Sequence, residues 1–299
     1  MLDIRVETFL EVCRTRSYTK AAEILCITQP AVTQHIKFLE SEYGVKLVEY
    51  SNRTLTLTDA GILFERYCME AMISNKILNE KLNEMRSGSK SLCFAATLTI
   101  GEFTLAPIIS DFIRKFDKYD IRMFVDNTEK VTKMLLEGEV TFALVEGLFN
   151  KADFESKLLK MEDFILVAPN SHPLTRREEI YLEDIRNQKI IVRENGSGSR
   201  NVLERALFDK NITLDNFESI IEIGNVNLMK TLVRDGIGLS FMYRDSVRTE
   251  IDAGDLVELK IKDFRVQREF NFLYLNNELT QTEVNECFLF FKEALHKMS

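Results

Sequence analysis

The stretch of the sequence most suited to binding a ligand is a glycine- and serine-rich loop at residues 195–200, which reads NGSGSR. An apolar run, KIIVR at residues 189–193, precedes this loop, and a helix-like stretch at residues 201–207 follows it. A strand that enters a helix through such a turn points free backbone N–H groups and the positive end of the helix at an anion. The loop therefore predicts a small-anion site, either the phosphate loop of an enzyme or a site that only binds.

Catalytic motifs are lacking in the rest of the sequence. The loop does not contain G-x-x-x-x-G-K-[ST], and it departs from G-x-G-x-x-G because Asn201 stands where the last glycine belongs. The few histidines and scattered cysteines are not at metal-ligand spacing, at His35, His172, His296, Cys13, Cys26, Cys68, Cys93 and Cys287. We therefore predict no catalytic residue, no metal and no cofactor, and keep an anion- or phosphate-binding enzyme that uses residues 196–200 as the alternative.

The overall composition is that of a globular protein long enough for two or three domains, with 299 residues of which 45% are apolar. There is no cationic and apolar leader and no uncharged apolar run of about 18 residues, so we expect a cytoplasmic protein without membrane spans. The net charge of −8 argues against DNA binding, but residues 14–37 hold four cations against one acid. Such a local basic surface is suited to phosphate contacts.

The N-terminal region is predicted to form three short helices, and the third has two distinct faces. We expect Thr28 to cap this third helix, and Ser17 or Thr19 to cap the second. One face is apolar at helical spacing, at Val32, Ile36, Leu39 and Tyr43. The other face is mostly polar and includes long side chains, at Pro30, Thr33, Gln34 and Lys37. Such a helix suits the major groove of DNA, although spacing alone fits a solvated helical bundle equally well.

A short strand after the helices favours DNA binding over the bundle. Leu55 and Leu57 alternate with threonines directly after Asn52 and Arg53. A helix-turn-helix followed by such a strand is a winged helix-turn-helix. Arg53 stands where a wing would reach phosphate or the minor groove.

The N-terminal region strongly resembles that of the LysR-type transcriptional regulators. The resemblance rests on Phe9 and Leu10, on SYTKAAEILCITQPAVTQHIKFLE at residues 17–40, on GVKL at 44–47 and on LTLTDAG at 55–61. It implies a sequence-specific regulator with DNA contacts from Thr28, Gln29, Pro30, Ala31, Thr33, Gln34, Lys37 and Arg53. One departure is Glu49-Tyr50, where the family usually has an arginine; losing this cation is expected to weaken nonspecific affinity.

A long helix is predicted after the wing, because residues 58–86 contain no proline and Thr58 can cap their start. Apolar residues recur at heptad spacing, at Phe64, Ala71, Leu78 and Met85, with Cys68, Asn75 and Leu82 as the second seam. The pattern fits a two-stranded coiled coil or a helix lying on its own domain, and the resemblance favours a homodimer, or a homotetramer of such dimers. We expect domains at residues 1–57, 58–87 and 88–299, with a hinge at 87–91.

The second half of the chain alternates strand-like and helix-like segments, which predicts an α/β fold with parallel strands and helices on both faces. Strands are expected at residues 92–96, 121–125, 141–145, 164–168, 189–192, 220–223 and 239–242, with a return at 262–272. We expect one lobe at residues 88–162 and 265–299 and another at 163–264. This matches the type 2 periplasmic-binding-protein-like effector domain of LysR-type regulators, so the resemblance covers essentially the whole chain.

Ligands in such sheets bind beyond the carboxyl ends of the strands, where three predicted loops meet in the cleft between the lobes. We expect the effector to be bound by Thr97, Thr99, Asn127, Glu146, Ser197, Gly198, Ser199, Arg200 and Asn225. Helix capping alone would explain any one of Thr97, Ser199 and Asn225, and Glu204 is an alternative partner for Arg200. The hydroxyls, amides and free N–H groups favour a carboxylate or an inorganic oxyanion. Segments such as TLTIGE and GSGSR are most similar to regulators of sulfur assimilation and carbon fixation.

These observations decide among three classes of protein. An exported solute-binding protein would need the signal that this N-terminus lacks, and would have no use for a winged helix. An enzyme would need the catalytic groups that are missing from the loop. We therefore predict a homo-oligomeric transcriptional regulator that binds double-stranded DNA and a small, anionic effector.

Overall fold

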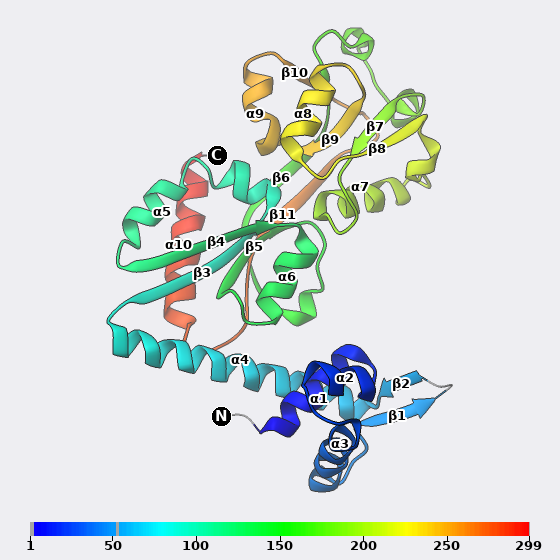
Figure 1. The fold of residues 1–299 in the computed structure, drawn as a ribbon. Coiled ribbons are helices and arrows are strands. Elements are labelled where there is room, and N and C mark those ends of the chain that lie inside the picture. Colours follow the sequence, from blue (N-terminus) through cyan, green and yellow to red (C-terminus); the bar gives the residue numbers. More distant parts are fainter. Residues whose placement is uncertain (1–2, 52–53, 299) are drawn as a thin grey trace. The chain divides into compact units, whose positions relative to one another are not determined.

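Two compact units make up the structure, a computed structural model that describes residues 3–51 and 54–298 (Figure 1). The first unit spans Met1–Ser87 and the second spans Gly88–Ser299. Arg53, the DNA contact predicted in the wing, lies outside the described residues.

The first unit begins with three helices, α1 (Ile4–Thr15), α2 (Tyr18–Ile24) and α3 (Gln29–Tyr43). The Ser17 hydroxyl accepts a hydrogen bond from the Lys20 N–H at 3.3 Å, and the Thr28 hydroxyl accepts one from the Ala31 N–H at 3.4 Å. Pro30 lies in the first turn of α3, where a missing N–H leaves no helical bond unmade. The predicted caps at Ser17 and Thr28 are confirmed.

The apolar face of α3 packs into the core of this unit through Val32, Ile36 and Leu39, which are at most 3% exposed. Tyr43, predicted to belong to the same stripe, is 54% exposed. It is the last residue of α3, so only one side of its ring is covered, by Phe64 at a centroid distance of 4.9 Å. The expectation that Tyr43 is buried was wrong for this reason.

The wing is an antiparallel pair of strands, β1 (Val48–Ser51) and β2 (Thr54–Leu57), which confirms the strand predicted from alternation. Leu55 points into the core and is 3% exposed. The buried carboxylate of Glu40, on α3, holds the start of the wing. Its Oε1 accepts hydrogen bonds from the N–H groups of Leu47 at 3.0 Å and Val48 at 3.4 Å.

Removing this carboxylate is expected to destabilise the first unit. In Glu40→Ala the buried Leu47 N–H loses its acceptor, so the free energy of unfolding should fall by about 1–3 kcal/mol. Glu42→Ala, at an exposed position of the same helix, is the matched control. Chemical unfolding followed by circular dichroism measures both variants, and equal stabilities would show that Glu40 does not hold the wing.

The long helix α4 (Asp59–Ser87) begins at the predicted cap, since the Thr58 hydroxyl accepts a hydrogen bond from the Gly61 N–H at 3.0 Å. A Cβ atom on Gly61 would lie 2.0 Å from the carbonyl oxygen of Leu47. Glycine is therefore what allows the first turn of α4 to lie against the chain that leads into the wing.

The two halves of the heptad pattern on α4 have different surroundings. Phe64 and Cys68 pack onto the core of the first unit. Further along, Leu78, Leu82 and Met85 are 44%, 52% and 81% exposed. The start of α4 thus lies on its own domain, one of the two arrangements expected, and the later turns leave an apolar seam uncovered.

A mixed nine-stranded sheet forms the centre of the second unit, in the order β4-β3-β5-β11-β6-β9-β7-β8, with β10 paired to β6 (Figure 1). The strands are β3 (Lys90–Thr97), β4 (Tyr119–Asp126), β5 (Phe142–Glu146), β6 (Glu155–Pro169), β7 (Lys189–Val192), β8 (Ser219–Glu222), β9 (Leu239–Tyr243), β10 (Leu256–Leu259) and β11 (Val266–Tyr274). The strands β3, β4 and β5 are parallel, and so are β7, β8 and β9. The antiparallel pair β6 and β11 joins the two groups.

Helices cover both faces of this sheet, as expected for an α/β fold. They are a π-helix at Ile100–Thr104, α5 (Ile109–Lys115), α6 (Thr128–Leu136), α7 (Gly198–Phe208), α8 (Val226–Arg234), α9 (Arg244–Asp252) and α10 (Gln281–Met298), with short 3-10 helices at Lys151–Asp153, Pro173–Arg176, Leu182–Ile185 and Leu214–Asn216. Phe94 and Phe142 face α10, while their neighbours Ala95 and Ala143 face α6. Among the described helices, none is long and apolar enough to cross a membrane.

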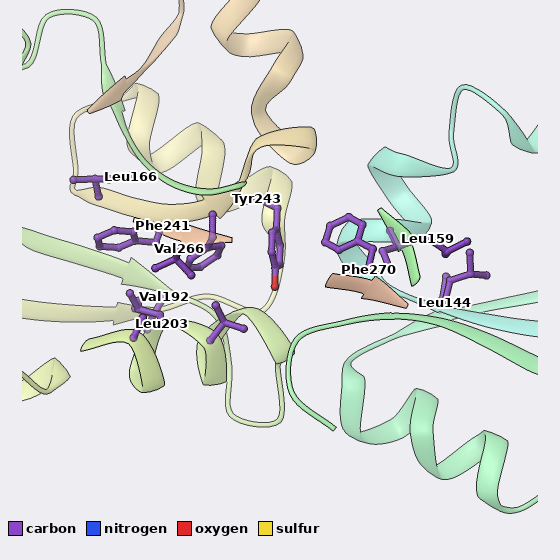
Figure 2. Close-up of a cluster of buried hydrophobic side chains, with 14 of the residues drawn as sticks. Leu144, Leu159, Leu166, Val192, Leu203, Phe241, Tyr243, Val266 and Phe270 are labelled. Atoms are coloured by element: carbon purple, nitrogen blue, oxygen red, sulfur yellow. The ribbon is translucent and has the colours of Figure 1, made fainter. Parts of the chain in front are cut away.

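Two lobes share the sheet through β6 and β11, which pair with each other along most of their length. Residues 270–274 of β11 pair with β5, and residues 164–167 of β6 pair with β9, so each lobe uses a different end of the same two strands. Figure 2 shows Tyr243 between apolar side chains of the two lobes, with Phe270 on one side and Phe241 on the other. The two-lobed architecture is confirmed, and the lobe limits at 162/163 and 264/265 stay a prediction.

The structure corrects several element boundaries. Between the strands expected at 92–96 and 121–125, the chain forms two helices in place of one continuous helix, because Pro107 interrupts the helical pattern at residues 105–108. The strand expected at residue 164 begins at Glu155, because its first half crosses the other lobe with partly exposed side chains. Of the residues expected to form a hinge, 87–91, the first ends α4 and the last two belong to β3, which begins at Lys90. The elements α9 and β10 were not predicted.

Candidate functional site

The polar face of α3 is available for contact with another molecule. Every predicted contact on it is exposed or half-buried, namely Thr28, Gln29, Pro30, Ala31, Thr33, Gln34 and Lys37. Gln29 and Thr33 are tied to each other, Nε2 donating to Oγ1 at 2.9 Å. In the part of the chain that the structure describes, the side chains of Gln34 and Lys37 make no hydrogen bond or ion pair. They are therefore free to bind an external partner.

A small cavity lies between the two lobes of the second unit, near the carboxyl ends of β7 and β9. Its volume is about 10 Å³, enough for one water molecule. It is lined by Thr99, Arg193, Ser199, Val226, Met229, Phe241, Met242, Tyr243 and Ser246. Thr99 comes from the lobe built on β3, and the other lining residues come from the lobe built on β7 and β9. A molecule held here would contact both lobes.

The lobes are in close contact beside the cavity. A Cβ atom on Gly198 would lie 2.4 Å from the Thr128 hydroxyl oxygen and 2.7 Å from the Glu146 carbonyl oxygen, both across the interface. Glycine at this position therefore allows the two backbones to approach. Elsewhere on the interface the Thr104 hydroxyl donates to Oδ2 of Asp245 at 2.8 Å. The structure is thus a closed arrangement of the lobes.

A buried arginine and two serines form one wall of the site. Arg193 is 5% exposed, and its Nε and Nη2 donate to the Glu194 carboxylate at 2.8 and 2.9 Å. The hydroxyls of Ser197 and Ser199 lie 3.0 Å apart at the start of α7. Ser197 is the N-cap residue of α7, but its side chain makes no capping hydrogen bond. Hydroxyls, helix N-terminal N–H groups and a guanidinium in one place stabilise an anion.

Two buried polar groups beside this wall have no hydrogen-bond partner within the described residues: Oε2 of Glu146 and the hydroxyl of Tyr243. Both side chains are at most 3% exposed. Burial raises the pKa of Glu146 to about 7, although the charge of Arg193 and hydrogen bonds from Thr99 oppose this shift. Burial also raises the pKa of Tyr243, so its hydroxyl stays protonated. Unpaired buried polar atoms are rare in proteins, and these two mark a place for a ligand or water.

Several predicted effector residues meet at this cavity. Thr99 and Ser199 line it, and Ser197 contacts Ser199. Glu146 contacts Thr99, and the backbone of Gly198 lies against that of Glu146. The structure therefore brings together five of the predicted residues from both lobes.

Three other predicted residues have structural partners. Asn127 caps α6 and Asn225 caps α8, each side chain accepting a hydrogen bond from a backbone N–H, at 3.0 and 2.9 Å. The Thr97 hydroxyl accepts a hydrogen bond from the N–H of Glu146 at 3.4 Å and so links β3 to β5. Capping thus accounts for Asn225, as considered from the sequence, and a side-chain hydrogen bond to the end of β5 accounts for Thr97.

Arg200 pairs with two acids that do not line the cavity, and one of them is Glu204, the alternative partner considered from the sequence. Its Nε pairs with Glu204 at 2.8 Å and its Nη1 pairs with Glu222 at 2.5 Å. Glu204 lies one turn further along α7 and Glu222 ends β8, so these two acids hold the side chain between α7 and β8. Arg193 is the arginine that lines the cavity.

Sequence reasoning missed Arg193, Tyr243 and Ser246 as lining residues. The sequence contains a signal that could have identified Arg193 and Tyr243. Arg193 directly follows the apolar strand KIIV, and Tyr243 ends the apolar strand LSFMY. Both therefore stand at carboxyl ends of strands, where α/β folds bind ligands.

Each of the two units matches the model of a known protein family. Residues 5–62 match the model described as "Bacterial regulatory helix-turn-helix protein, lysR family". Residues 86–296 match the model described as "LysR substrate binding domain". The chain belongs to the LysR family. This LysR-type protein is a DNA-binding transcriptional regulator with an effector-binding domain, and the enzyme alternative is not supported.

Individual relatives agree with this assignment. This LysR-type regulator is 29% identical to the HTH-type transcriptional regulator CysL of Bacillus subtilis, over 90% of this chain and 89% of CysL. It is also 29% identical to a probable RuBisCO transcriptional regulator of Trieres chinensis, over 86% of this chain and 85% of that protein. The fold resembles the CcmR regulatory domain of Synechocystis PCC6803, solved in complex with 2-PG, with a TM-score of 0.60 and 20% identity, over 67% of this chain and 97% of CcmR.

Proposed function

We propose that a small anion binds in the cavity between the lobes and thereby controls how the winged helix-turn-helix binds DNA. The observation that carries this proposal is Arg193, buried in the cavity wall beside the serine hydroxyls of α7. A guanidinium removed from water is stabilised by negative charge, and here Glu194 occupies only Nε and Nη2. We propose that Nη1, which is not part of this ion pair, contacts the ligand. The CcmR domain solved with 2-PG supports a small-molecule ligand in this kind of domain.

The closed cavity implies that binding is coupled to motion of the lobes. A space of about 10 Å³ holds one water molecule, so a larger anion requires the lobes to part at contacts such as the one beside Gly198. A ligand that prefers one arrangement of the lobes shifts the population toward it. Effector control in this regulator would then be a population shift and not a chemical step.

DNA recognition is proposed to use the polar face of α3 in the major groove. Gln34 would contact base edges and Lys37 would contact phosphate, because an amide can read a base and a lysine is a point charge. The adjoining contacts are proposed to come from Thr28, Gln29, Pro30, Ala31 and Thr33. Arg53 would add a wing contact.

A homodimer through α4 is proposed for the assembly, because Leu78, Leu82 and Met85 form an exposed apolar seam at heptad spacing. Pairing of such dimers would give a tetramer. The domain limits at residues 1–57, 58–87 and 88–299, and a cytoplasmic location, belong to the same proposal.

Ser199→Ala is expected to weaken anion binding by about two- to tenfold, because it removes one neutral hydrogen bond from the cavity wall. Calorimetry with phosphate, sulfate, acetate and glycolate on the full chain measures the loss. Ser110→Ala, on the exposed side of α5, is the matched control, and DNA affinity without anion should be the same in all three proteins. Equal anion affinities in Ser199→Ala and the wild type would remove Ser199 from the site.

A further inference from the structure

We propose that the effector is an anion that also carries a hydrogen-bond donor, and that Glu146 and Tyr243 select it by binding that donor group. The inference rests on the proposed function, because it concerns the same cavity. It goes further by assigning the chemical class of the ligand and two residues that determine specificity.

The geometry places an acceptor and a donor around the anion-binding wall. Tyr243 lines the cavity from the end of β9, and its hydroxyl is buried without a partner among the described residues. Glu146 ends β5 in the opposite lobe, is held by Thr99 of the cavity wall, and has an equally unpartnered Oε2. Arg193 lies close enough to Glu146 for its charge to act on the carboxylate. An anion on Arg193 would therefore lie beside both unpartnered groups.

The chemistry of these groups discriminates between anions. An ionised carboxylate only accepts hydrogen bonds, so Oε2 of Glu146 opposite a ligand without hydrogens would bring two negative charges together out of water. A hydroxyl, ammonium or acidic O–H on the ligand would instead donate to Oε2, and the oxygen of a hydroxyl or acidic O–H could also accept a hydrogen bond from Tyr243. Sites built around such a bond reject analogues that lack it, because the buried partner is then left unpaired. Hydroxycarboxylates, amino acids and protonated oxyanions fit this pattern, whereas sulfate and acetate do not.

A single water molecule could satisfy Glu146 and Tyr243 without any ligand, since the cavity has room for one. Such a water leaves unexplained why a buried arginine and two serine hydroxyls at a helix N-terminus line the same space. The two explanations differ in one measurable respect. Only direct contact with the ligand makes anion affinity depend on a donor group.

Matched pairs of probes test the proposal on the full chain. Glycolate differs from acetate by one hydroxyl, and hydrogen phosphate differs from sulfate by its proton. At pH 8 we expect calorimetry to show that the wild type prefers the donor-bearing member of each pair by about tenfold or more. In Glu146→Gln, whose amide both donates and accepts, we expect the preference to fall below about threefold and the affinity for sulfate to rise. A rise in affinity is not expected from mere structural damage.

Tyr243→Phe provides a second variant, expected to weaken binding of glycolate and hydrogen phosphate more than that of acetate and sulfate, because only the first two carry an O–H group that can accept from the tyrosine hydroxyl. The pH dependence provides a third readout that needs no substitution. Because the pKa of Glu146 is raised to about 7, this carboxyl is protonated at pH 5.5 and can donate, so sulfate should bind the wild type more tightly at pH 5.5 than at pH 8. The charged groups nearby are Arg193, its partner Glu194 and, beside Tyr243, Arg268 and Glu162. Glu146→Gln controls for any titration of Glu194 or Glu162.

The outcomes separate this inference from the function on which it rests. Equal binding of both members of each pair by the wild type, or an unchanged preference in Glu146→Gln, would overturn the inference and leave an anion-controlled regulator. Binding that occurs through Arg193 but ignores the donor would identify the unpartnered groups as a water site. Failure of the wild type to bind any of the four probes would overturn both proposals.

Discussion

Gln34→Ala should weaken binding to the preferred DNA sequence by roughly five- to a hundredfold and relax the preference at one base position. The reason is that Gln34 is exposed on the polar face of α3 and has no partner within the described residues, so its amide is free to bind a base edge. The preferred sequence is first selected by the wild-type protein from random duplexes. Fluorescence anisotropy on that sequence and on single-base variants then measures both affinity and preference.

Lys37→Ala, a substitution on the same face of α3, should affect DNA binding in a different way from Gln34→Ala. A phosphate contact carries no base information, so affinity should fall for all sequences alike, and the slope of log affinity against log salt should decrease by about 1. Glu42→Gln, exposed on α3 about 140° around the helix from Lys37, is the control for damage to the helix. Wild-type affinity, preference and salt slope in both variants would exclude α3 as the recognition helix.

Arg193→Gln should lower anion affinity by about ten- to a hundredfold. The substitution keeps most of the side-chain volume and removes the positive charge of a residue that lines the cavity. Hydrogen bonds to a charged group contribute roughly 1.5–3 kcal/mol. Arg200→Gln is the matched comparison, because Arg200 lies in the first turn of the neighbouring helix α7 but pairs with Glu204 and Glu222. We expect this second variant to bind anions within about twofold of the wild type.

The reverse order of anion affinities in the two arginine variants would contradict the proposal that Arg193, and not Arg200, binds the anion. A large loss in Arg200→Gln with little change in Arg193→Gln would mean that Arg200 leaves its ion pairs to reach the ligand. Calorimetry with phosphate and glycolate distinguishes the two results. Thermal unfolding of each variant shows whether the loss is specific to the ligand or follows from reduced stability.

Local signals in the sequence were sufficient for the first unit. The Thr28 cap, the apolar spacing of Val32, Ile36 and Leu39, and the alternation around Leu55 each depend on residues a few positions apart. Such short-range patterns fix helices and hairpins almost without tertiary context. Tyr43 fails the same pattern because burial at a helix end depends on what happens to pack there.

The effector site required information that no local pattern contains. Arg193 and Arg200 belong to the same segment, and Glu222, distant in sequence, is one of the acids that hold Arg200 away from the cavity. Likewise Glu146 and Tyr243 are remote in the chain, and their shared lack of partners appears only once the lobes are placed together. The loop at residues 195–200 contributes Ser199 to the cavity lining, whereas the arginine of that lining is Arg193, which precedes the loop.

The coupling between ligand and DNA is tested most directly by measuring DNA binding with and without the anion. The wild type and Arg193→Gln are titrated with the selected duplex in the absence and presence of phosphate or glycolate, whichever binds the wild type more tightly. We predict that both proteins bind DNA equally without anion, and that saturating anion changes the affinity or the footprint of the wild type alone. An unresponsive wild type, or an identical response in Arg193→Gln, would contradict control of DNA binding through this cavity.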